Sequence, residues 1–309
     1  MFARKLTPAE YWRAGLNMAV AFEGPFDFEK EQENSQTAQV NPKQELYGSF
    51  MSENEPPVAS LVMNRKQMRF DGHMVKMAGV GGVATLPANR RGGAIRACME
   101  LSLRDFYNEG YAFSHLYPFS TAYYRQFGFA AAGHSVSWKV KISELRGLPK
   151  AGGSVRQLLP GDDLSPLLDI YNEMYKDVNF ACARETFNRA LDGDKPLAAK
   201  RWVFLWVDDS GAPGGFIVAT RDKDTLHCVP GFPSNDVLLF KDTRALCGLL
   251  NFVYSAFIAN FEDIQFCLPD HMDLTGLLPE LSGMNCKHVL NGMTRVLNVE
   301  EVLRLCRCR

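Results

Sequence analysis

The stretch Val80-Gly81-Gly82-Val83-Ala84-Thr85-Leu86-Pro87, followed by Arg90-Arg91-Gly92-Gly93-Ala94-Ile95-Arg96, decides how the first half of this chain folds. The β-branched residues before the proline predict a strand, and the segment after the glycines predicts the start of a helix. The N–H groups of a first helical turn have no partner within the helix, and the helix dipole favours an anion there. Glycines let a backbone approach a ligand closely, and arginines supply charge-assisted donors. The pattern therefore predicts a turn that binds phosphate.

Other interpretations of this stretch are weaker. As a string, residues 79–84 fit the dinucleotide fingerprint G-x-G-x-x-A, but that fingerprint requires a helix to begin within it, and here the strand continues. The glycines are more typical of a bulge or a splayed strand that another backbone approaches. The arginines fit a solvated helix start less well, because arginine at a helix N-terminus opposes the dipole unless an anion offsets it.

Composition limits the class of protein. A chain of 309 residues is longer than one compact core usually takes, so we expect two domains. With 46% hydrophobic and 22% charged residues the chain is ordinary for a globular protein, and a net charge of -1 argues against general binding to nucleic acid. No apolar run approaches the roughly 20 residues that span a membrane. We expect neither nucleic acid nor a membrane as partner.

Cysteine and histidine spacing predicts no metal site. The 8 cysteines include no Cys-x-x-Cys pair, and the 6 histidines follow no ligand spacing; His115, within a predicted strand, is interpreted as structural. Most cysteines lie among apolar residues, as free thiols of a reducing compartment do. The capping box Thr7-Pro8-Ala9-Glu10 opens a helix near the N-terminus, which differs from a signal peptide. We therefore expect a cytoplasmic protein.

Helices and strands alternate in the first half. Apolar residues from Ile95 to Phe106, spaced four, four and three apart, give one apolar face to a helix over about 94–108. The strand expected at 134–142 would complete this half. Further helices are predicted at about 8–22 and 122–127, and strands at 45–50, 58–63, 67–70, 75–87 and 111–117.

The pattern restarts after a linker at residues 148–153. The second half repeats the order of elements without an obvious residue repeat, which indicates a duplicated fold with helices packed on a sheet. Its strands are predicted at 154–159, 202–207, 214–221, 225–229, 237–240 and 264–268, and its helices at about 166–174, 185–191 and 243–260.

Tyr124 stands where a strand passes into a short helix. It belongs to an aromatic cluster with Tyr123, Phe127 and Phe129, of which at least two rings are expected to pack in the core. A tyrosine at such a junction can also present its hydroxyl to a cleft, and a neutral phenol, with a pKa near 10, can donate a proton to a departing thiolate. Position alone leaves both roles open. The sequence contains no G-x-S-x-G elbow and no Walker loop, which removes the main support for a hydrolase or a kinase.

Three ordered motifs carry a family resemblance. They are Gly81-Gly82-Val83-Ala84-Thr85-Leu86-Pro87, Arg90-Arg91-x-Gly93-x-x-Arg96 and Tyr124-Arg125-Gln126-Phe127-Gly128-Phe129. Together they resemble the GNAT N-acetyltransferases, and more closely the Eis (enhanced intracellular survival) family, whose members carry two tandem GNAT domains and a C-terminal sterol-carrier-protein-like domain. The resemblance implies an α/β fold, layered as α+β, with two GNAT-like domains, each a mixed, mostly antiparallel sheet flanked by helices. It implies a catalytic domain at 1–148, a degenerate second GNAT domain at 149–291, and the start of a truncated sterol-carrier-like domain or a tail at 292–309.

The resemblance also implies a binding site for acetyl-CoA as co-substrate, with no metal. The backbone of Val83, Ala84 and Thr85 would pair with the pantetheine arm as an added strand does, and a free N–H there would polarise the thioester carbonyl. Tyr124 matches the family's proton donor. The remaining cofactor-binding positions are Arg90, Arg91, Gly92, Gly93, Ala94, Ile95 and Arg96 around the pyrophosphate, and Phe119 and Ser120, where the family closes on the cofactor.

Two positions depart from the family pattern. Ile95 stands where the usual GNAT loop has glycine or alanine. Eis-type enzymes use their C-terminal carboxylate, delivered by the third domain, as general base, and residues 293–299 look like the entry to that domain shortly before the chain stops. We therefore do not assign the base to the carboxylate of Arg309, and we expect water in its place or no base.

The resemblance implies an acetyl-CoA-dependent N-acetyltransferase. The acceptor would be a small-molecule primary amine of the aminoglycoside, polyamine or lysine type, and a homo-oligomer is possible. Acidic residues between Glu23 and Glu33 could attract a cationic acceptor or form a solvated face. A CoA-binding but inactive scaffold or sensor is the alternative, which the missing base favours. An aminoacyltransferase that uses aminoacyl-tRNA is a third, against which the phosphate turn and the near-neutral charge argue.

The corresponding turn of the second half has a different character. Residues 241–247 contain no glycine pair and include Asp242, whose charge would repel pyrophosphate. We expect the second domain to bind no CoA and instead to wall the substrate cleft.

Overall fold

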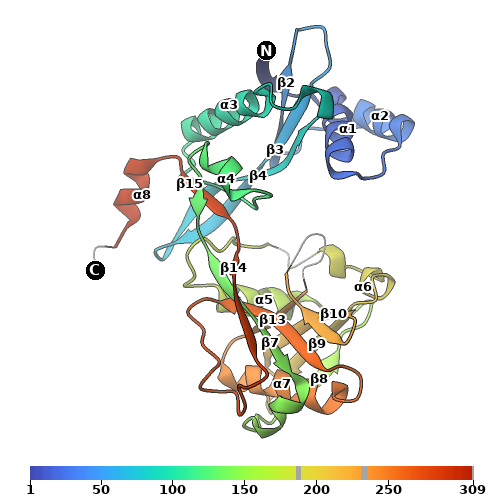
Figure 1. The fold of residues 1–309 in the computed structure, drawn as a ribbon, viewed down its shortest axis with the longest axis vertical. Coiled ribbons are helices and arrows are strands. Elements are labelled where there is room, and N and C mark those ends of the chain that lie inside the picture. Colours follow the sequence, from blue (N-terminus) through green and yellow to red (C-terminus); the bar gives the residue numbers. More distant parts are fainter. Residues whose placement is uncertain (186–188, 231–235, 308–309) are drawn as a thin grey trace. The chain divides into compact units, whose positions relative to one another are not determined.

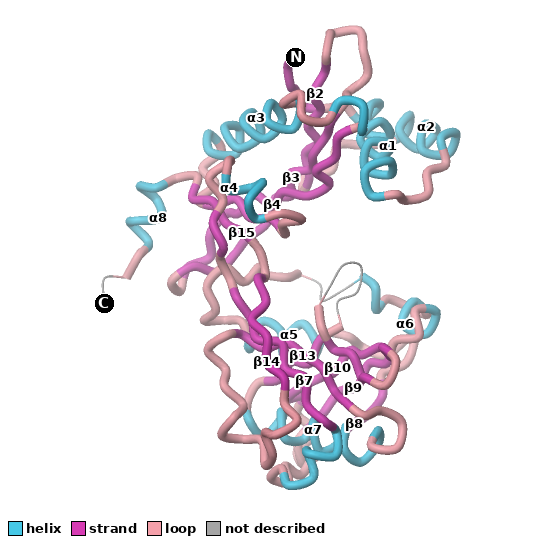
Figure 2. Tube along the Cα trace, viewed as in Figure 1, coloured by secondary structure: helices cyan, strands magenta, loops and turns pink. Residues whose placement is uncertain are grey.

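The computed structural model describes residues 1–185, 189–230 and 236–307, which form two compact units (Figure 1). The first unit contains Met1–Gly133, Asn179–Cys182 and Asn291–Arg309, and the second contains His134–Val178 and Ala183–Leu290. The carboxylate of Arg309 lies outside the described residues. Each unit is built on its own mixed sheet, drawn in magenta in Figure 2.

The sheet of the first unit has the strand order β1-β2-β3-β4-β5-β15-β6. Strand β4 runs parallel to β5, and the other described pairs are antiparallel. The strands of this unit are β1 (Phe2–Lys5), β2 (Gln44–Phe50), β3 (Ala59–Phe70), β4 (His73–Thr85), β5 (Phe113–Leu116), β6 (Ala130–Ala131) and β15 (Met293–Val296). The helices are η1 (Pro8–Glu10), α1 (Tyr11–Phe22), α2 (Phe28–Thr37), η2 (Pro87–Asn89), α3 (Ala94–Asn108), α4 (Thr121–Arg125) and α8 (Val299–Leu305).

The second unit repeats this plan, with one parallel pair, β11 with β13, among its described strands. Its strand order is β14-β7-β13-β11-β10-β9-β8, and β12 also pairs with β10. The strands are β7 (His134–Lys141), β8 (Ser154–Gln157), β9 (Trp202–Val207), β10 (Pro213–Asp222), β11 (Thr225–Cys228), β12 (Val237–Phe240), β13 (Asp263–Pro269) and β14 (Asn285–Leu290). The helices are η3 (Ile142–Gly147), α5 (Ser165–Met174), η4 (Arg189–Leu191), α6 (Lys195–Ala198) and α7 (Thr243–Phe257).

Two segments lie in a different unit from the one that their place in the sequence predicts. Strand β7, expected to complete the first half, pairs with β13 and β14 in the second sheet. Residues 292–309, expected to begin a truncated third domain or to form a tail, instead supply β15, which pairs with β5 and β6 of the first sheet. Helix α8 follows β15 and buries Val302 against Met68 and Phe113 of that unit. The compact units therefore do not follow the boundaries 1–148, 149–291 and 292–309.

Helices cover the first sheet in the way its sequence pattern predicts. Helix α3 buries Ile95, Met99, Leu103 and Phe106, the apolar face read from the sequence, against strands β1 to β4. Helix α1 lies against β3 and β4, and Figure 1 shows it on the other side of these strands from α3. The capping box before α1 is formed, because Glu10 Oε2 accepts the Thr7 N–H at 2.9 Å.

A bulge interrupts the pairing of β3 with β4. Ser60 pairs with Ala84 and Val62 pairs with Gly81, so β4 carries one residue more than β3 between these pairs. Gly82 adopts a left-handed φ of 56°, which glycine reaches without steric cost. The glycine-rich strand thus contains the bulge that its sequence predicts.

A buried ion pair joins three segments of the second unit. Arg201 Nε donates to Asp236 Oδ1 at 2.6 Å, and Thr220 Oγ1 donates to Asp236 Oδ2 at 2.9 Å. The side chains of Arg201 and Asp236 are only 8% and 1% exposed. A charge held this far from water depends on its partner, because the unpaired ion would have to be desolvated without compensation.

We predict that Asp236→Ala destabilises the protein by about 3–5 kcal/mol, since it leaves the buried Arg201 guanidinium without its carboxylate. Asp209→Ala is the matched control, because it breaks a surface pair with Arg244 in which the Asp209 side chain is 70% exposed, and it should cost far less stability. Urea unfolding followed by tryptophan fluorescence, with Trp202 and Trp206 reporting on the second unit, measures both changes. Equal losses for the two variants would contradict a special role for the buried pair.

Candidate active site

Strands β4 and β5 stop pairing about halfway along β4. Their parallel register begins at Met77 opposite Phe113 and ends at Val80 opposite Leu116, whereas β4 continues to Thr85. Beyond Val80 the edge of β4 that faced β5 is no longer paired with it, while the other edge still pairs with β3 as far as Thr85. Open N–H and C=O groups on a strand edge can accept an extended ligand as an added strand.

The predicted pantetheine-binding residues Val83, Ala84 and Thr85 lie on this open part of β4. Ala84 is buried and the other two are half-buried. The side chain of Ala84 packs inside the protein, so its contribution to any ligand is restricted to its backbone groups.

The N-terminus of α3 follows within ten residues of the open edge. Gly93 is its N-cap, with a left-handed φ of 83°, and it offers no side chain to bond the N–H groups of the first turn. A Cβ built on Gly93 would meet nothing within 4 Å, so the space in front of the helix is open. Ala94 and Ile95 are buried and pack with Val58. An anion can therefore bind their backbone N–H groups but not their side chains.

Two exposed arginines stand at this helix end. Arg90 and Arg91 are both exposed, and Arg91 holds a left-handed φ of 65°, a conformation that residues other than glycine seldom adopt. Gly92 and Gly93 are also exposed. Two guanidinium groups beside the positive end of a helix dipole repel it unless an anion is present, so charge and geometry both fit phosphate.

Arg96 has a different environment from Arg90 and Arg91. Its guanidinium donates to Gln126, contacts Glu100 at 3.4 Å and stacks over the Phe127 ring, 5.2 Å from the centroid. These contacts tie the start of α3 to the end of α4. Arg96 therefore positions the two helices relative to one another in addition to carrying charge.

Helix α4 begins in an aromatic cluster. Phe119 is 73% exposed, and its ring lies 5.1 Å from that of Tyr123 and 5.4 Å from that of Tyr124. Ser120 Oγ accepts the Tyr123 N–H at 3.3 Å and so caps α4. Tyr123 and Val83 both pack against the buried cluster that contains Ile95, which brings α4, the open edge of β4 and the start of α3 together.

Tyr124 is buried, with only 3% of its surface exposed. Its ring also contacts Phe129, and burial raises the pKa of its phenol above the usual 10. The phenol is therefore protonated at physiological pH. A neutral hydroxyl that the fold holds rigidly is a suitable proton donor, and the same packing also suits a core residue.

His115 lies beside the point where the strands part. It pairs with Gly79 of β4, and its Nδ1 lies 2.8 Å from Thr294 Oγ1 of β15. The ring is buried, and burial lowers the pKa of His115 to about 4. The neutral imidazole links β5 to β15, which agrees with the structural role predicted for it.

The second unit has a different helix start at the matching place. Asp242 is the N-cap of α7, and its Oδ1 accepts the Ala245 N–H at 2.8 Å. A carboxylate of the chain itself thus occupies the position that an anion would take.

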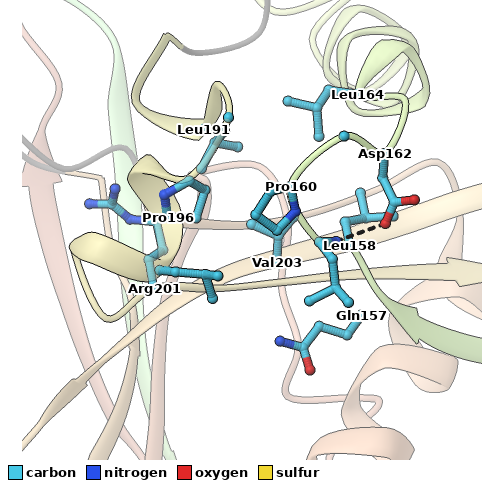
Figure 3. Close-up of a pocket in the computed structure, with 13 residues that line it drawn as sticks. Gln157, Leu158, Pro160, Asp162, Leu164, Leu191, Pro196, Arg201 and Val203 are labelled. Carbon is cyan, nitrogen blue, oxygen red and sulfur yellow. Dashed lines mark hydrogen bonds between the residues drawn. The ribbon is translucent and has the colours of Figure 1, made fainter.

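Figure 3 shows a small pocket of this unit, between Leu158 and Arg201, with a volume of about 30 Å³. That volume holds about one water molecule, so this pocket is no cofactor site.

The comparisons with known proteins agree with this geometry. Residues 3–132 match the family model of the acetyltransferase (GNAT) domain. A conserved protein of unknown function from Enterococcus faecalis V583, a probable N-acyltransferase, superposes with a TM-score of 0.80 at 21% identity, over 97% of this chain and 73% of that one. Eis1 from Mycobacterium abscessus superposes with a TM-score of 0.72 at 17% identity, over 98% of this chain and 75% of that one. A tandem GNAT protein from the clavulanic acid biosynthesis pathway superposes with a TM-score of 0.51 at 13% identity, over 96% of this chain and 98% of that one. No curated protein sequence matches the chain.

These likenesses establish the class of the fold. The chain has the architecture of a tandem GNAT protein, with two mixed, mostly antiparallel sheets flanked by helices, and the expected fold class is confirmed. The match to the GNAT domain falls within the first unit, which contains the open edge of β4 and the uncapped start of α3. In the part of the chain that the structure describes, no helix is long and apolar enough to cross a membrane, and no group of three metal-ligating side chains occurs.

We predict that His115 makes the stability of the protein depend on pH. The unfolded histidine takes up a proton near pH 6.5 and the folded one only near pH 4, so its contribution is complete above pH 6.5 and is lost as the pH falls toward 4. At pH 5 the loss should be about 2 kcal/mol. Urea unfolding of the wild type and of His115→Gln at pH 7 and pH 5 tests this, because the variant lacks the titrating group. The same loss in both proteins would rule out the histidine as the cause.

Proposed function

We propose that this protein is an N-acetyltransferase of the Eis type that moves an acetyl group from acetyl-CoA to a primary amine. The observation that carries the proposal is the uncapped N-terminus of α3, which follows directly after the unpaired edge of β4. One feature suits a pyrophosphate and the other suits an extended amide-containing arm, and they stand in the order in which CoA presents these groups.

The residues present fit acetyl-CoA. The N–H groups at the start of α3, with Arg90 and Arg91, would hold the pyrophosphate, and the backbone of Val83 to Thr85 would pair with the pantetheine arm. Bound acetyl-CoA supplies an acetyl group activated as a thioester. A backbone N–H of the open edge of β4, beside the bulge, would polarise the acyl carbonyl.

Tyr124 is proposed as the general acid. Its phenol is protonated at physiological pH and would donate its proton to the sulfur that leaves when the amine has attacked. The acceptor is proposed to be an aminoglycoside, a polyamine or a lysine-type amine. The second unit is proposed to bind no CoA, because the Asp242 carboxylate already bonds to the start of α7.

The experiment that tests the proposal is a calorimetric titration with acetyl-CoA, which needs no knowledge of the acceptor. We expect one site per chain and a loss of about tenfold to a hundredfold in affinity for Arg91→Ala, the usual effect of removing a charge-assisted hydrogen bond. Arg104→Ala is the matched control, because Arg104 is an exposed arginine further along α3, away from its N-terminus, and affinity should not change. No binding by the folded wild type would refute the proposal, and two sites per chain would contradict the role assigned to Asp242.

We predict that Tyr124→Phe lowers turnover by about 10²-fold to 10⁴-fold, since it removes the phenol proton and keeps the ring. Tyr123→Phe is its matched control, because Tyr123 is the neighbouring tyrosine in the same cluster and should retain turnover within about threefold. Steady-state release of CoA thiol with a panel of amines measures both.

Burial of Tyr124 among aromatic rings also suits the alternative, a CoA-binding scaffold without activity. Binding of acetyl-CoA without turnover on any amine of the panel would favour that scaffold.

A further inference from the structure

A methionine covers the bulge at the point where β4 and β5 separate. A Cβ built on Gly82 would lie 2.6 Å from Met18 Sδ and 3.1 Å from Val62 Cγ2. No side chain can therefore occupy position 82 while Met18 keeps its place. The thioether of α1 rests directly on the glycine backbone, two residues beyond the last pair between β4 and β5.

The direction of the proposed site shows which part of acetyl-CoA would reach this point. The pyrophosphate would be held at Gly93 and the first turn of α3, and the pantetheine arm would run back along Thr85, Ala84 and Val83. The far end of that arm carries the thioester, so the acyl group would lie where the strands separate, next to Gly82. This step rests on the proposed function.

Of the two side chains next to the proposed acyl position at Gly82, that of Met18 is the one that can move. Val62 is fixed in the middle of β3, where both of its neighbouring strands hold it. Met18 is half-buried on α1 and has an unbranched, flexible side chain that fills irregular gaps. The room next to Gly82 therefore depends on where the Met18 side chain lies.

We propose that Met18 limits the length of the acyl group that the protein accepts, so that acetyl fits and longer chains do not. An acyl chain longer than acetyl would have to displace the Met18 thioether from Gly82. Truncating the side chain frees several atoms' volume against the bulge, and the longer acyl groups then gain room. A single methylene is commonly worth about tenfold or more in an apolar pocket, so butyryl-CoA, with two additional methylenes, is a sensitive probe.

The test is calorimetric titration of wild type and Met18→Ala with free CoA, acetyl-CoA and butyryl-CoA. We expect the wild type to bind acetyl-CoA at least about tenfold more tightly than butyryl-CoA, and the variant to bind the two within about threefold. Free CoA has no acyl group, so both proteins should bind it alike. Met74→Ala is the matched control, because Met74 is 47% exposed near the start of β4, and it should keep the wild-type preference.

A second variant tests the same side chain in the opposite direction. Met18→Phe enlarges the side chain and should weaken binding of acetyl-CoA about tenfold while leaving that of free CoA unchanged. If both variants keep the wild-type ratio of acetyl-CoA to butyryl-CoA affinity, the inference about Met18 is wrong although the protein binds CoA. If the wild type binds neither free CoA nor its thioesters, the proposed function itself fails, and the inference fails with it.

Discussion

The parting of β4 from β5 is the constraint on which the candidate site depends. A mixed sheet normally satisfies both edges of an inner strand, and β4 gives up one of them from Gly81 onward. The fold supports this open edge by the pairing with β3, which resumes after the bulge and reaches Thr85, and by α3, whose buried face crosses β1 to β4. Backbone groups in such a place are rigid but not bonded across the gap, which is the state a ligand needs in order to bind them without reorganising the strand.

The two units show how one plan can keep or close such a site. In the first, β4 passes through the gap as one strand with a single-residue bulge. In the second, the corresponding partner of β10 is split into β11 and β12, and the Arg201–Asp236 ion pair holds the second piece at its start. The N-cap position of the helix that follows is Gly93 in one unit, with no side chain to cap the helix, and Asp242 in the other, whose carboxylate caps it. Glycine leaves the helix dipole open to an external anion, and aspartate satisfies it internally.

Local chemistry was readable from the sequence, but strand partners were not. The spacing from Ile95 to Phe106 defines the face of α3, and the glycines predict the bulge, because both depend on neighbouring residues. The alternation in β7 fits either sheet equally well, so nothing in residues 134–142 indicates that they pair with β13. The place of Met18 was not predictable for the same reason, since one methionine on an amphipathic helix has no special spacing, and only its contact with Gly82 distinguishes it.

The exchange of β7 and β15 between the units has a consequence for synthesis on the ribosome. The first sheet needs β15, which begins at Met293, so most of the chain must emerge before residues 1–133 can complete their sheet. Domains usually fold one after another as they leave the ribosome, but here the first unit must wait for the second. Until then β5 lacks a neighbour on one side and exposes an unpaired edge, a feature that favours association with other unfinished chains.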